Sequence, residues 1–286
     1  MAWFAIAALS SLTFGLAGFF MKVSAARRGS VAHLLLGLYL TGTLGFLLWM
    51  WREGTFRTDV PTLVGGLLLG LGSTLGNLLF MKALDHGPAS LTTPLVNTNI
   101  LLIILFSVIV YGERLSWFET AGVTLLVLAI LLIPIDRNEK LAIRNPRWYA
   151  LLLMATLLFS FRNGGLKVTQ EMHIPGTPVL FYGYVLGLIW FVVEVLRQPR
   201  SGDTEARKAA RTGLVWGLLS GIFSFLGMQL YSVALIDGPA SIVAPMFATN
   251  SLIVAILSIL IYRERLSILQ TCSLVFLFAG LILIRL

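Results

Sequence analysis

One stretch of the chain occurs twice, and this duplication constrains the fold more than any other feature. Residues 87–116 read GPASLTTPLVNTNILLIILFSVIVYGERLS, and residues 238–267 read GPASIVAPMFATNSLIVAILSILIYRERLS, at a constant offset of 151. The shared positions include a Gly-Pro-Ala-Ser start, a proline, a Thr-Asn pair and a Glu-Arg-Leu-Ser ending, which chance rarely repeats in register within apolar runs. A weaker match joins residues 14–22 to residues 159–167 at an offset of 145. The sequence therefore predicts an internal duplication.

Composition assigns the chain to the membrane. Of the 286 residues, 57% are hydrophobic and 12% are charged, whereas soluble domains carry about 25% charged residues. The net charge of +8 does not indicate a nucleic-acid partner, because the basic residues stand at the ends of apolar runs and in short loops. The single cysteine, Cys272, excludes an intrachain disulfide, and no residue pattern indicates a metal or cofactor site. We expect an all-α integral membrane protein.

A bilayer core about 30 Å thick requires about 20 apolar residues per helix. The two halves are predicted to be residues 1–136 and residues 148–286, joined by a cytoplasmic linker over residues 137–147. The first span has no basic residue before it, so we interpret it as a retained helix rather than a cleaved signal peptide. We predict ten transmembrane helices, which cover about residues 3–21, 31–51, 61–83, 89–111, 117–135, 148–167, 177–196, 213–235, 240–262 and 267–284.

The distribution of basic residues predicts the orientation of the chain in the membrane. Fifteen of the 21 Lys and Arg residues lie in the loops after the first, third, fifth, seventh and ninth spans. This bias places those loops in the cytoplasm and both chain ends outside it, in a plasma membrane of the bacterial inner-membrane type. Because each half has five spans, the second half must insert in the opposite sense to the first. The expected architecture is therefore two inverted five-helix repeats.

This pattern resembles a known family. Ten spans, two five-helix repeats, a first helix with an aromatic-Gly…Lys pattern, a Gly-Pro-Ala hairpin and a Tyr-x-Glu-Arg-Leu-Ser ending are similar to those of the EamA-type transporters of the drug/metabolite transporter superfamily. The resemblance covers essentially the whole chain. It implies a ten-helix, inverted-repeat carrier with a central cavity that works by alternating access. Carriers of this kind bind their substrate near the bilayer midplane, between the repeats.

Arg162 is the candidate binding residue to which we give most weight. It follows Trp148 by 14 residues, which is about 21 Å along a helix, so it lies within an apolar span. A cation inside the bilayer is costly, and such residues usually face a wet cavity or a partner. A guanidinium at this position suits a substrate that carries a carboxylate or phosphate. The alternative is a snorkelling arginine that reaches the outer headgroups.

Other polar residues inside the predicted spans are candidates for the cavity wall, with bonds between helices as the alternative. Pro94 and Pro245 precede the two Thr-Asn pairs; each is expected to break its helix locally and to free backbone carbonyls beside the pair. Pro88 and Pro239, each after a glycine, are expected to start the second helix of a tight hairpin. The candidate wall residues are Asn77, Asn97, Thr98, Asn99, Asn163, Tyr184, Gln229, Thr249 and Asn250.

Charged residues at span ends form matched sets, one set in each half. In an inverted repeat these sets lie at opposite faces of the membrane, where the gates of a carrier close. Anchoring of the helix ends by local pairing is the favoured interpretation, and a gate is the alternative. The residues are Lys22, Glu113, Arg114, Lys167, Glu264 and Arg265.

A carboxylate near the middle of a span is missing from the sequence. Glu194 lies within a span, but it is one turn from Arg197 at the end of that span. Carriers of cations and proton-coupled drug pumps usually need such a carboxylate, so exchange or facilitated diffusion is favoured over proton coupling. We expect a secondary transporter that moves a small polar metabolite, with an amino acid or another carboxylate-bearing solute as the leading candidate.

Two other classes of protein were weighed against a transporter. A membrane enzyme needs a nucleophile and a base, or metal ligands, at one depth, and the sequence has no such motif, so no enzymatic activity is expected. A membrane scaffold or lipid-modulating protein without solute transport is the second alternative. The expected partners are a small-molecule substrate and the lipid bilayer, without nucleic acid, and the sequence does not decide between a monomer and a homodimer.

Overall fold

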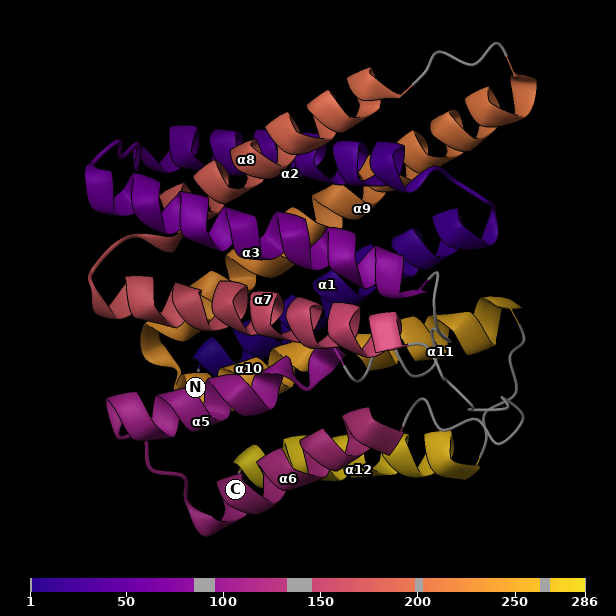
Figure 1. The fold of residues 1–286 in the computed structure, drawn as a ribbon. Helices are drawn as coiled ribbons and strands as arrows, with labels where there is room; N and C mark the ends of the chain where they lie inside the picture. Colours follow the sequence, from indigo (N-terminus) through magenta and orange to yellow (C-terminus); the bar gives the residue numbers. More distant parts are fainter. Residues whose placement is uncertain (1, 85–95, 133–145, 199–202, 263–267, 286) are drawn as a thin grey trace.

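The computed structural model describes residues 2–84, 96–132, 146–198, 203–262 and 268–285. Over these ranges the chain is helical apart from short connections (Figure 1). The helices are α1 (Ala2–Ala26), α2 (Val31–Glu53), α3 (Val60–Leu84), α5 (Asn99–Tyr111), α6 (Trp117–Leu132), α7 (Pro146–Glu171), α8 (Gly176–Arg197), α9 (Thr204–Asp237), α10 (Ala240–Ala248), α11 (Asn250–Tyr262) and α12 (Ile268–Arg285). Pro88, Pro94, Glu264 and Arg265 lie outside the described residues.

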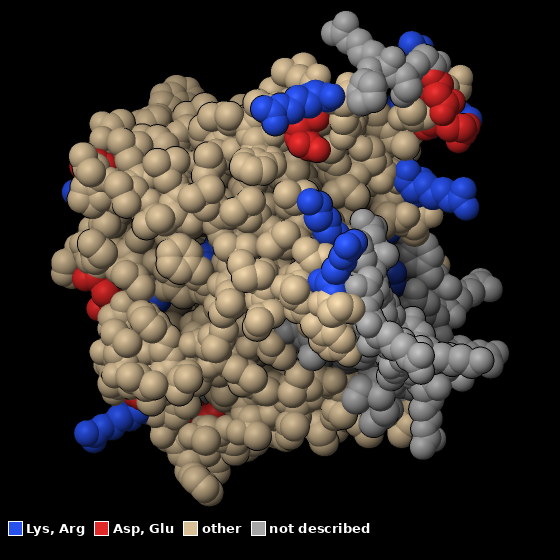
Figure 2. Space-filling model, viewed as in Figure 1, with Lys and Arg blue, Asp and Glu red and all other residues tan. Residues whose placement is uncertain are grey.

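Several of these helices have the length and composition of membrane spans. Among the described residues, six helices are long and apolar enough to cross a bilayer: Ala2–Ala26, Val31–Glu53, Val60–Ala83, Pro146–Glu171, Gly176–Arg197 and Thr204–Asp237. Large apolar side chains such as Leu48 and Ile109 are 60% and 70% exposed on the outer surface. On the face shown in Figure 2, charged side chains gather towards the two ends of the helices and leave a broad uncharged region between them. The chain is therefore a multi-pass membrane protein.

Local chemistry explains where helices begin and end. The backbone turns into the left-handed region at Gly54 (φ 65°) and Gly112 (φ 62°), where glycine has no Cβ to clash. The N–H of Gly54 then donates to the carbonyl of Met50, which closes the last turn of α2. At the start of α3, the Asp59 carboxylate accepts a hydrogen bond of 3.1 Å from the backbone N–H of Thr62, as a capping residue does.

The second Gly-Pro pair forms a tight hairpin. Helix α9 ends at Asp237, Pro239 is the N-cap residue of α10, and α10 begins at Ala240. An added Cβ on Gly238 would lie 2.6 Å from the carbonyl oxygen of Ala234, so the close approach requires glycine here. The ring of Pro239 sets φ to −65°, which suits the entry into a helix.

The span predicted over residues 240–262 is interrupted at Thr249. Pro245 lies inside α10 and has no N–H to donate to the preceding turn. Helix α10 ends at Ala248, and the amide Nδ2 of Asn250 donates to the Phe247 carbonyl at 2.7 Å. In the first half, Nδ2 of Asn99 makes the same bond to the Val96 carbonyl at 2.8 Å. The duplicated Thr-Asn pair therefore has the same local role in both halves.

The two halves interleave. Helix α9 of the second half packs on α1 and α2, and α3 of the first half packs on α7 and α8. Helix α5 packs on α7 and α10, α10 on α1, and α6 on α12. These contacts are equivalent in the two halves: the contact of α1 with α9 corresponds to that of α7 with α3, and the contact of α2 with α9 to that of α8 with α3.

Glycines permit the closest of these contacts. Gly217 of α9 lies directly against the backbone of Leu34 in α2. At the equivalent position between α3 and α8, an added Cβ on Gly66 would lie 3.0 Å from the carbonyl oxygen of Val179. Such close approach of helix backbones is typical of membrane helices with small residues at the interface. The duplicated halves therefore use the same packing mode.

The first and last helices place the two ends of the described chain at the same end of the fold (Figure 1). In Figure 1 the N-terminal end of α1 and the C-terminal end of α12 are at the same end of the helix stack, while α7 starts at the opposite end. Helix α1 and helix α7, the first helices of the two halves, therefore run in opposite directions in this view.

Candidate functional site

Arg162 of α7 is buried in the interior, with 8% of its surface exposed. Its Nε donates a hydrogen bond of 2.9 Å to Oδ1 of Asn163. The guanidinium carbon also lies 4.7 Å from the ring centroid of Phe159 and 5.8 Å from that of Phe14. Within the described ranges no Asp or Glu forms an ion pair with it. Aromatic faces and one amide offset only part of the cost of removing this cation from water.

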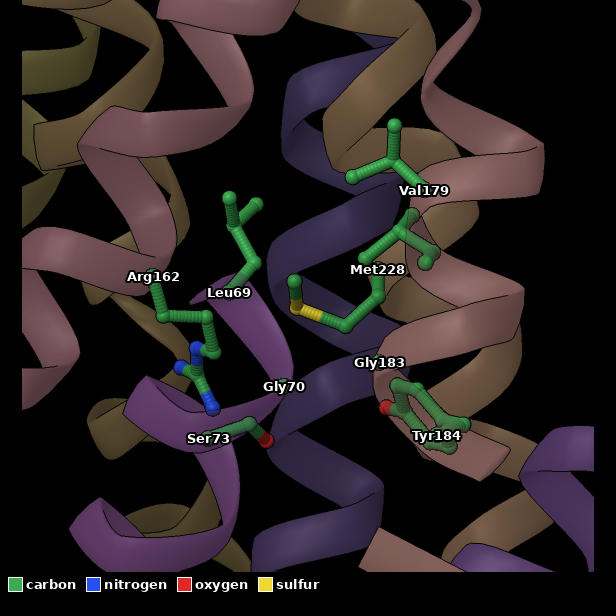
Figure 3. A pocket seen from close by; sticks show the side chains of 9 residues that line it. Leu69, Gly70, Ser73, Arg162, Val179, Gly183, Tyr184 and Met228 are labelled. Atoms are coloured by element: carbon green, nitrogen blue, oxygen red, sulfur yellow. The ribbon is translucent and has the colours of Figure 1, made fainter. Parts of the chain in front are cut away.

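The guanidinium lines a small cavity between the halves. In Figure 3, Arg162 and Tyr184 face the hollow from opposite sides, and Ser73 lies between them. The cavity volume is about 10 Å³, which is close to the least space that holds one water molecule. Its lining consists of Leu69, Gly70, Ser73, Arg162, Val179, Leu180, Gly183, Tyr184 and Met228.

A line of amides connects Arg162 to the first half of the chain. Asn163 accepts from Arg162 through Oδ1, and its Nδ2 lies 3.4 Å from Oδ1 of Asn99 in α5. Nδ2 of Asn99 in turn donates a hydrogen bond to the carbonyl of Val96. The hydroxyl of Tyr231 in α9 donates to the Asn163 carbonyl at 3.3 Å. Three of the predicted wall residues, Arg162, Asn163 and Asn99, are therefore joined.

Two tyrosines meet beside this cavity. The rings of Tyr39 in α2 and Tyr184 in α8 are 5.3 Å apart. The Tyr39 hydroxyl is 2.9 Å from Oγ of Ser73, and the Tyr184 hydroxyl is 2.7 Å from Oγ of Ser224. The tyrosines differ by 145 positions and the serines by 151, which are the two offsets of the sequence duplication. The two Tyr–Ser pairs are therefore equivalent positions of the two halves.

The packing around the two tyrosines repeats as well. Gly42 lies against the ring of Tyr184, and Gly187 lies against the ring of Tyr39. These glycines also differ by 145 positions. Ser73 and Ser224 were not among the predicted site residues; the offset of 151 relates them to each other, but it does not indicate that each bonds a tyrosine.

The remaining predicted wall residues lie in contacts between or within helices. Oγ1 of Thr249 is 2.6 Å from Oγ of Ser11 in α1. Gln229 of α9 and Thr177 of α8 are joined by a bond of 2.8 Å. Asn77 donates to the Tyr39 hydroxyl at 3.0 Å, so it supports the tyrosine pair.

Three further predicted residues lie near the breaks in the fourth and ninth spans. Asn97 and Thr98 are partly buried where α5 begins, and Thr98 is its N-cap residue. Asn250 is partly buried, and its amide group bonds the carbonyl of Phe247. Asn250 thus lies outside the amide line of Arg162.

One predicted charged residue, Glu113, joins the two halves. Its Oε2 accepts from the backbone N–H and the hydroxyl of Ser241 at 3.0 and 2.6 Å, and its Oε1 accepts from the N–H of Ala240 at 3.1 Å. A carboxylate at this position satisfies the unpaired N–H groups of the first turn of α10. Lys167 of α7 lies 3.9 Å away and also pairs with Glu171 at 2.9 Å.

The other charged span-end residues differ in exposure. Arg114 is exposed beside Glu113, whereas Lys22 is partly buried. In the described part of the chain, no group of three or more His, Cys, Asp or Glu side chains could hold a metal ion.

The fold and the site define a class: a multi-pass helical membrane protein whose two related halves enclose a small cavity lined by Arg162 and mostly apolar residues. The comparison with protein families identifies the class more closely. The EamA-like transporter family matches residues 1–135 and again residues 146–286. The chain belongs to this family, and the predicted duplication is confirmed, because the family pattern occurs twice.

Comparisons with individual proteins add the fold alone. A solved structure described only as "Crystal structure of protein" has a TM-score of 0.78 and 15% sequence identity, and the match covers 98% of each chain. At this identity the similarity shows a shared fold and nothing about substrate. No curated protein matches the chain.

Proposed function

We propose that this chain is a ten-span carrier of two inverted repeats that moves a small carboxylate-bearing metabolite by alternating access, with an amino acid as the leading candidate. Membership of a transporter family supports the transport function. The inverted arrangement is supported by the reciprocal contacts between the halves and by the opposite directions of α1 and α7. Inverted repeats commonly place a substrate at their interface.

The observation that carries the substrate proposal is the state of Arg162. Among the described residues the buried guanidinium has one hydrogen-bonded amide partner, at Nε, which leaves its Nη groups for an anionic ligand. Carboxylates bind arginine through paired, charge-assisted hydrogen bonds. In this proposal the carboxylate binds Arg162, and Asn163 holds the side chain in place. In the same proposal the solute passes the helix breaks before α5 and between α10 and α11. The first break is lined by Asn97, Thr98 and Asn99, and the second by Asn250.

The small cavity implies that the helices separate when a solute binds. A volume of about 10 Å³ holds no metabolite, so the structure corresponds to a closed state of the carrier. Glu113 is a candidate gate residue, because its bonds tie the end of α5 to the start of α10 across the two halves. Separation of these helices would require those bonds to break.

The orientation remains as the sequence predicts it, with both chain ends outside the cytoplasm of a bacterial-type cell. It is supported by the exposed basic side chains in Figure 2, most of which lie at the end opposite to both termini. Cytoplasmic ends of membrane proteins carry such an excess of Lys and Arg.

Uptake by proteoliposomes tests the proposed function. Purified protein is reconstituted, loaded or left empty, and exposed to labelled amino acids and other carboxylates in parallel with neutral and cationic solutes. We expect saturable uptake of at least one carboxylate solute, and a loss of about 10-fold to 150-fold in Arg162→Ala, the equivalent of a charged hydrogen bond worth about 1.5–3 kcal/mol. A pH gradient is imposed in a second series to separate proton coupling from exchange.

Two results would overturn the proposal. Uptake that never saturates for any solute would favour a scaffold or lipid-modulating protein. Unchanged anion uptake in Arg162→Ala, Asn99→Ala and Asn250→Ala would remove the site assignment while leaving transport intact.

A further inference from the structure

The two halves agree around the tyrosine pair, but a residue next to it, beside the cavity, differs between them. Tyr39 with Ser73 and Tyr184 with Ser224 are equivalent pairs. Asn77 of α3, one turn after Ser73, donates to the Tyr39 hydroxyl. The residue one turn after Ser224 is Met228, which stands 151 positions after Asn77. A hydrogen-bonding amide in one half is thus replaced by a thioether in the other.

Met228 belongs to the cavity wall that faces Arg162. Its side chain is 1% exposed and lines the cavity with Val179 and Leu180. Figure 3 shows Met228 between Leu69 and Val179, across the hollow from the guanidinium.

Opposite Arg162 the cavity wall is apolar at Met228, Val179 and Leu180, beside the hydroxyl of Tyr184, which is bonded to Ser224. Arg162 is also a departure from symmetry, because the equivalent position in the first half, 145 residues earlier, is Ala17. The two departures together place a cation on one side of the hollow and a thioether on the other.

We propose that Met228 is a specificity-determining residue, which selects solutes whose end remote from the carboxylate is apolar. The inference rests on the proposed function and specifies the chemistry of the part of the substrate that does not bind Arg162. With the carboxylate on Arg162, the remainder of the solute lies against Met228, Val179 and Leu180. A hydroxyl or amide there would lose its water without gaining a partner. Methionine has a flexible, polarizable side chain, which adapts to apolar groups of different shapes.

Pairs of isosteric amino acids test this assignment. Valine and threonine differ by a methyl group against a hydroxyl, and leucine and asparagine differ by two methyl groups against the oxygen and nitrogen of a carboxamide. Each is used to inhibit proteoliposome uptake of a transported carboxylate. For the wild type we expect valine and leucine to inhibit at lower concentrations than their polar isosteres, by about 10-fold to 100-fold, the range in which an apolar pocket discriminates against a hydroxyl.

The test variant is Met228→Asn, which installs the residue that the first half has at the equivalent position. Within each pair of amino acids, it should reduce the ratio of the two inhibitory concentrations by about 10-fold. The matched control, Met228→Leu, keeps an apolar side chain of similar volume and should keep the wild-type order within each pair. The unfolding temperature of both variants without solute shows that they are folded.

The outcomes separate this inference from the proposed function. The ratios of inhibitory concentrations could be equal in the wild type and Met228→Asn while uptake still depends on Arg162. That result would overturn the role of Met228 and leave the proposed function standing. A wild type that prefers threonine and asparagine would overturn that role as well. Lack of inhibition by all four amino acids in the wild type, with no carboxylate transported, would overturn both.

Discussion

At the scale of single residues, the environment of Arg162 is the feature that needs a functional explanation. A guanidinium that reached the headgroups would have its charged end exposed, whereas this side chain is buried beside Phe159 and Phe14. Burial of a cation without a carboxylate is unfavourable for folding. The proposed binding role explains why the side chain remains, because in that proposal an anionic solute supplies the missing partner.

The amide line makes a testable contribution to this arrangement. Asn163→Ala removes the acceptor of Arg162 and the partner of Asn99, and we expect it to lower the free energy of unfolding by about 1–3 kcal/mol. It should also raise the solute concentration that half-saturates uptake, because Arg162 loses its support. Thermal unfolding in detergent and uptake kinetics measure the two effects.

Ser160→Ala is the matched control on the same helix. Ser160 is partly exposed and bonds only the carbonyl of Leu157, within its own helix. Its substitution should change the free energy of unfolding by less than about 0.5 kcal/mol. Equal unfolding temperatures and equal half-saturation in the two variants would contradict the positioning role of Asn163.

The sequence indicated which polar residues lie near the cavity, but it did not indicate which groups they bond. Arg162, Asn163 and Asn99 were predicted to lie at one site, and the structure joins them. Thr249 and Asn250 were in the same prediction, but their side chains bond Ser11 and the Phe247 carbonyl. Composition and depth cannot separate these cases, because a side-chain bond to a carbonyl three residues earlier depends on the local break in the helix.

At the scale of helices, Glu113 shows that one residue can link elements from both halves. Glu113→Ala removes three hydrogen bonds to the first turn of α10. We expect this variant to lower the free energy of unfolding by about 1–3 kcal/mol, the cost of leaving such groups unpaired. It should also shift the carrier towards states in which α5 and α10 separate. Thermal unfolding measures the first effect. Labelling of a cysteine placed at Ala240, which bonds Glu113 through its backbone N–H, measures the second.

Glu171→Ala is the control for Glu113→Ala, since both carboxylates lie near Lys167. The Glu171 side chain is 47% exposed, and exposed ion pairs are typically worth about 0–1 kcal/mol. A loss of stability as large for Glu171→Ala as for Glu113→Ala would show that Lys167 pairing, and not the cap on α10, is responsible.

Helix ends and breaks were predicted where their chemistry is local. The Gly-Pro hairpin between α9 and α10 follows from residue preferences, and the structure has it. A helix break was expected at Pro245, and in the structure α10 ends at Ala248, three residues after this proline. The apolar run over residues 240–262 indicates only how much chain can cross a bilayer; the proline is the residue that indicates the interruption.

At the scale of the whole molecule, the duplication explains more than the number of helices. The offsets of 145 and 151 relate the two Tyr–Ser pairs and the two glycines beside the rings. The interleaving of the halves, with α9 on α1 and α2 and α3 on α7 and α8, was not predicted. Contacts between distant segments depend on packing that a single sequence does not display. Arg162 and Met228 both depart from the symmetry of the halves. They can be recognised as parts of one site only after the tyrosine pairs have been located.

The opposite insertion of the two halves is the central claim, and two equivalent loop residues test it directly. Arg28 follows α1 and His173 follows α7; they differ by 145 positions, are exposed, and have φ of 56° and 58°. In a Cys272→Ser background, Arg28→Cys and His173→Cys are labelled with a membrane-impermeant maleimide in sealed vesicles of known orientation. The account predicts that the two cysteines react from opposite sides of the membrane. Reaction of both from the same side would contradict it.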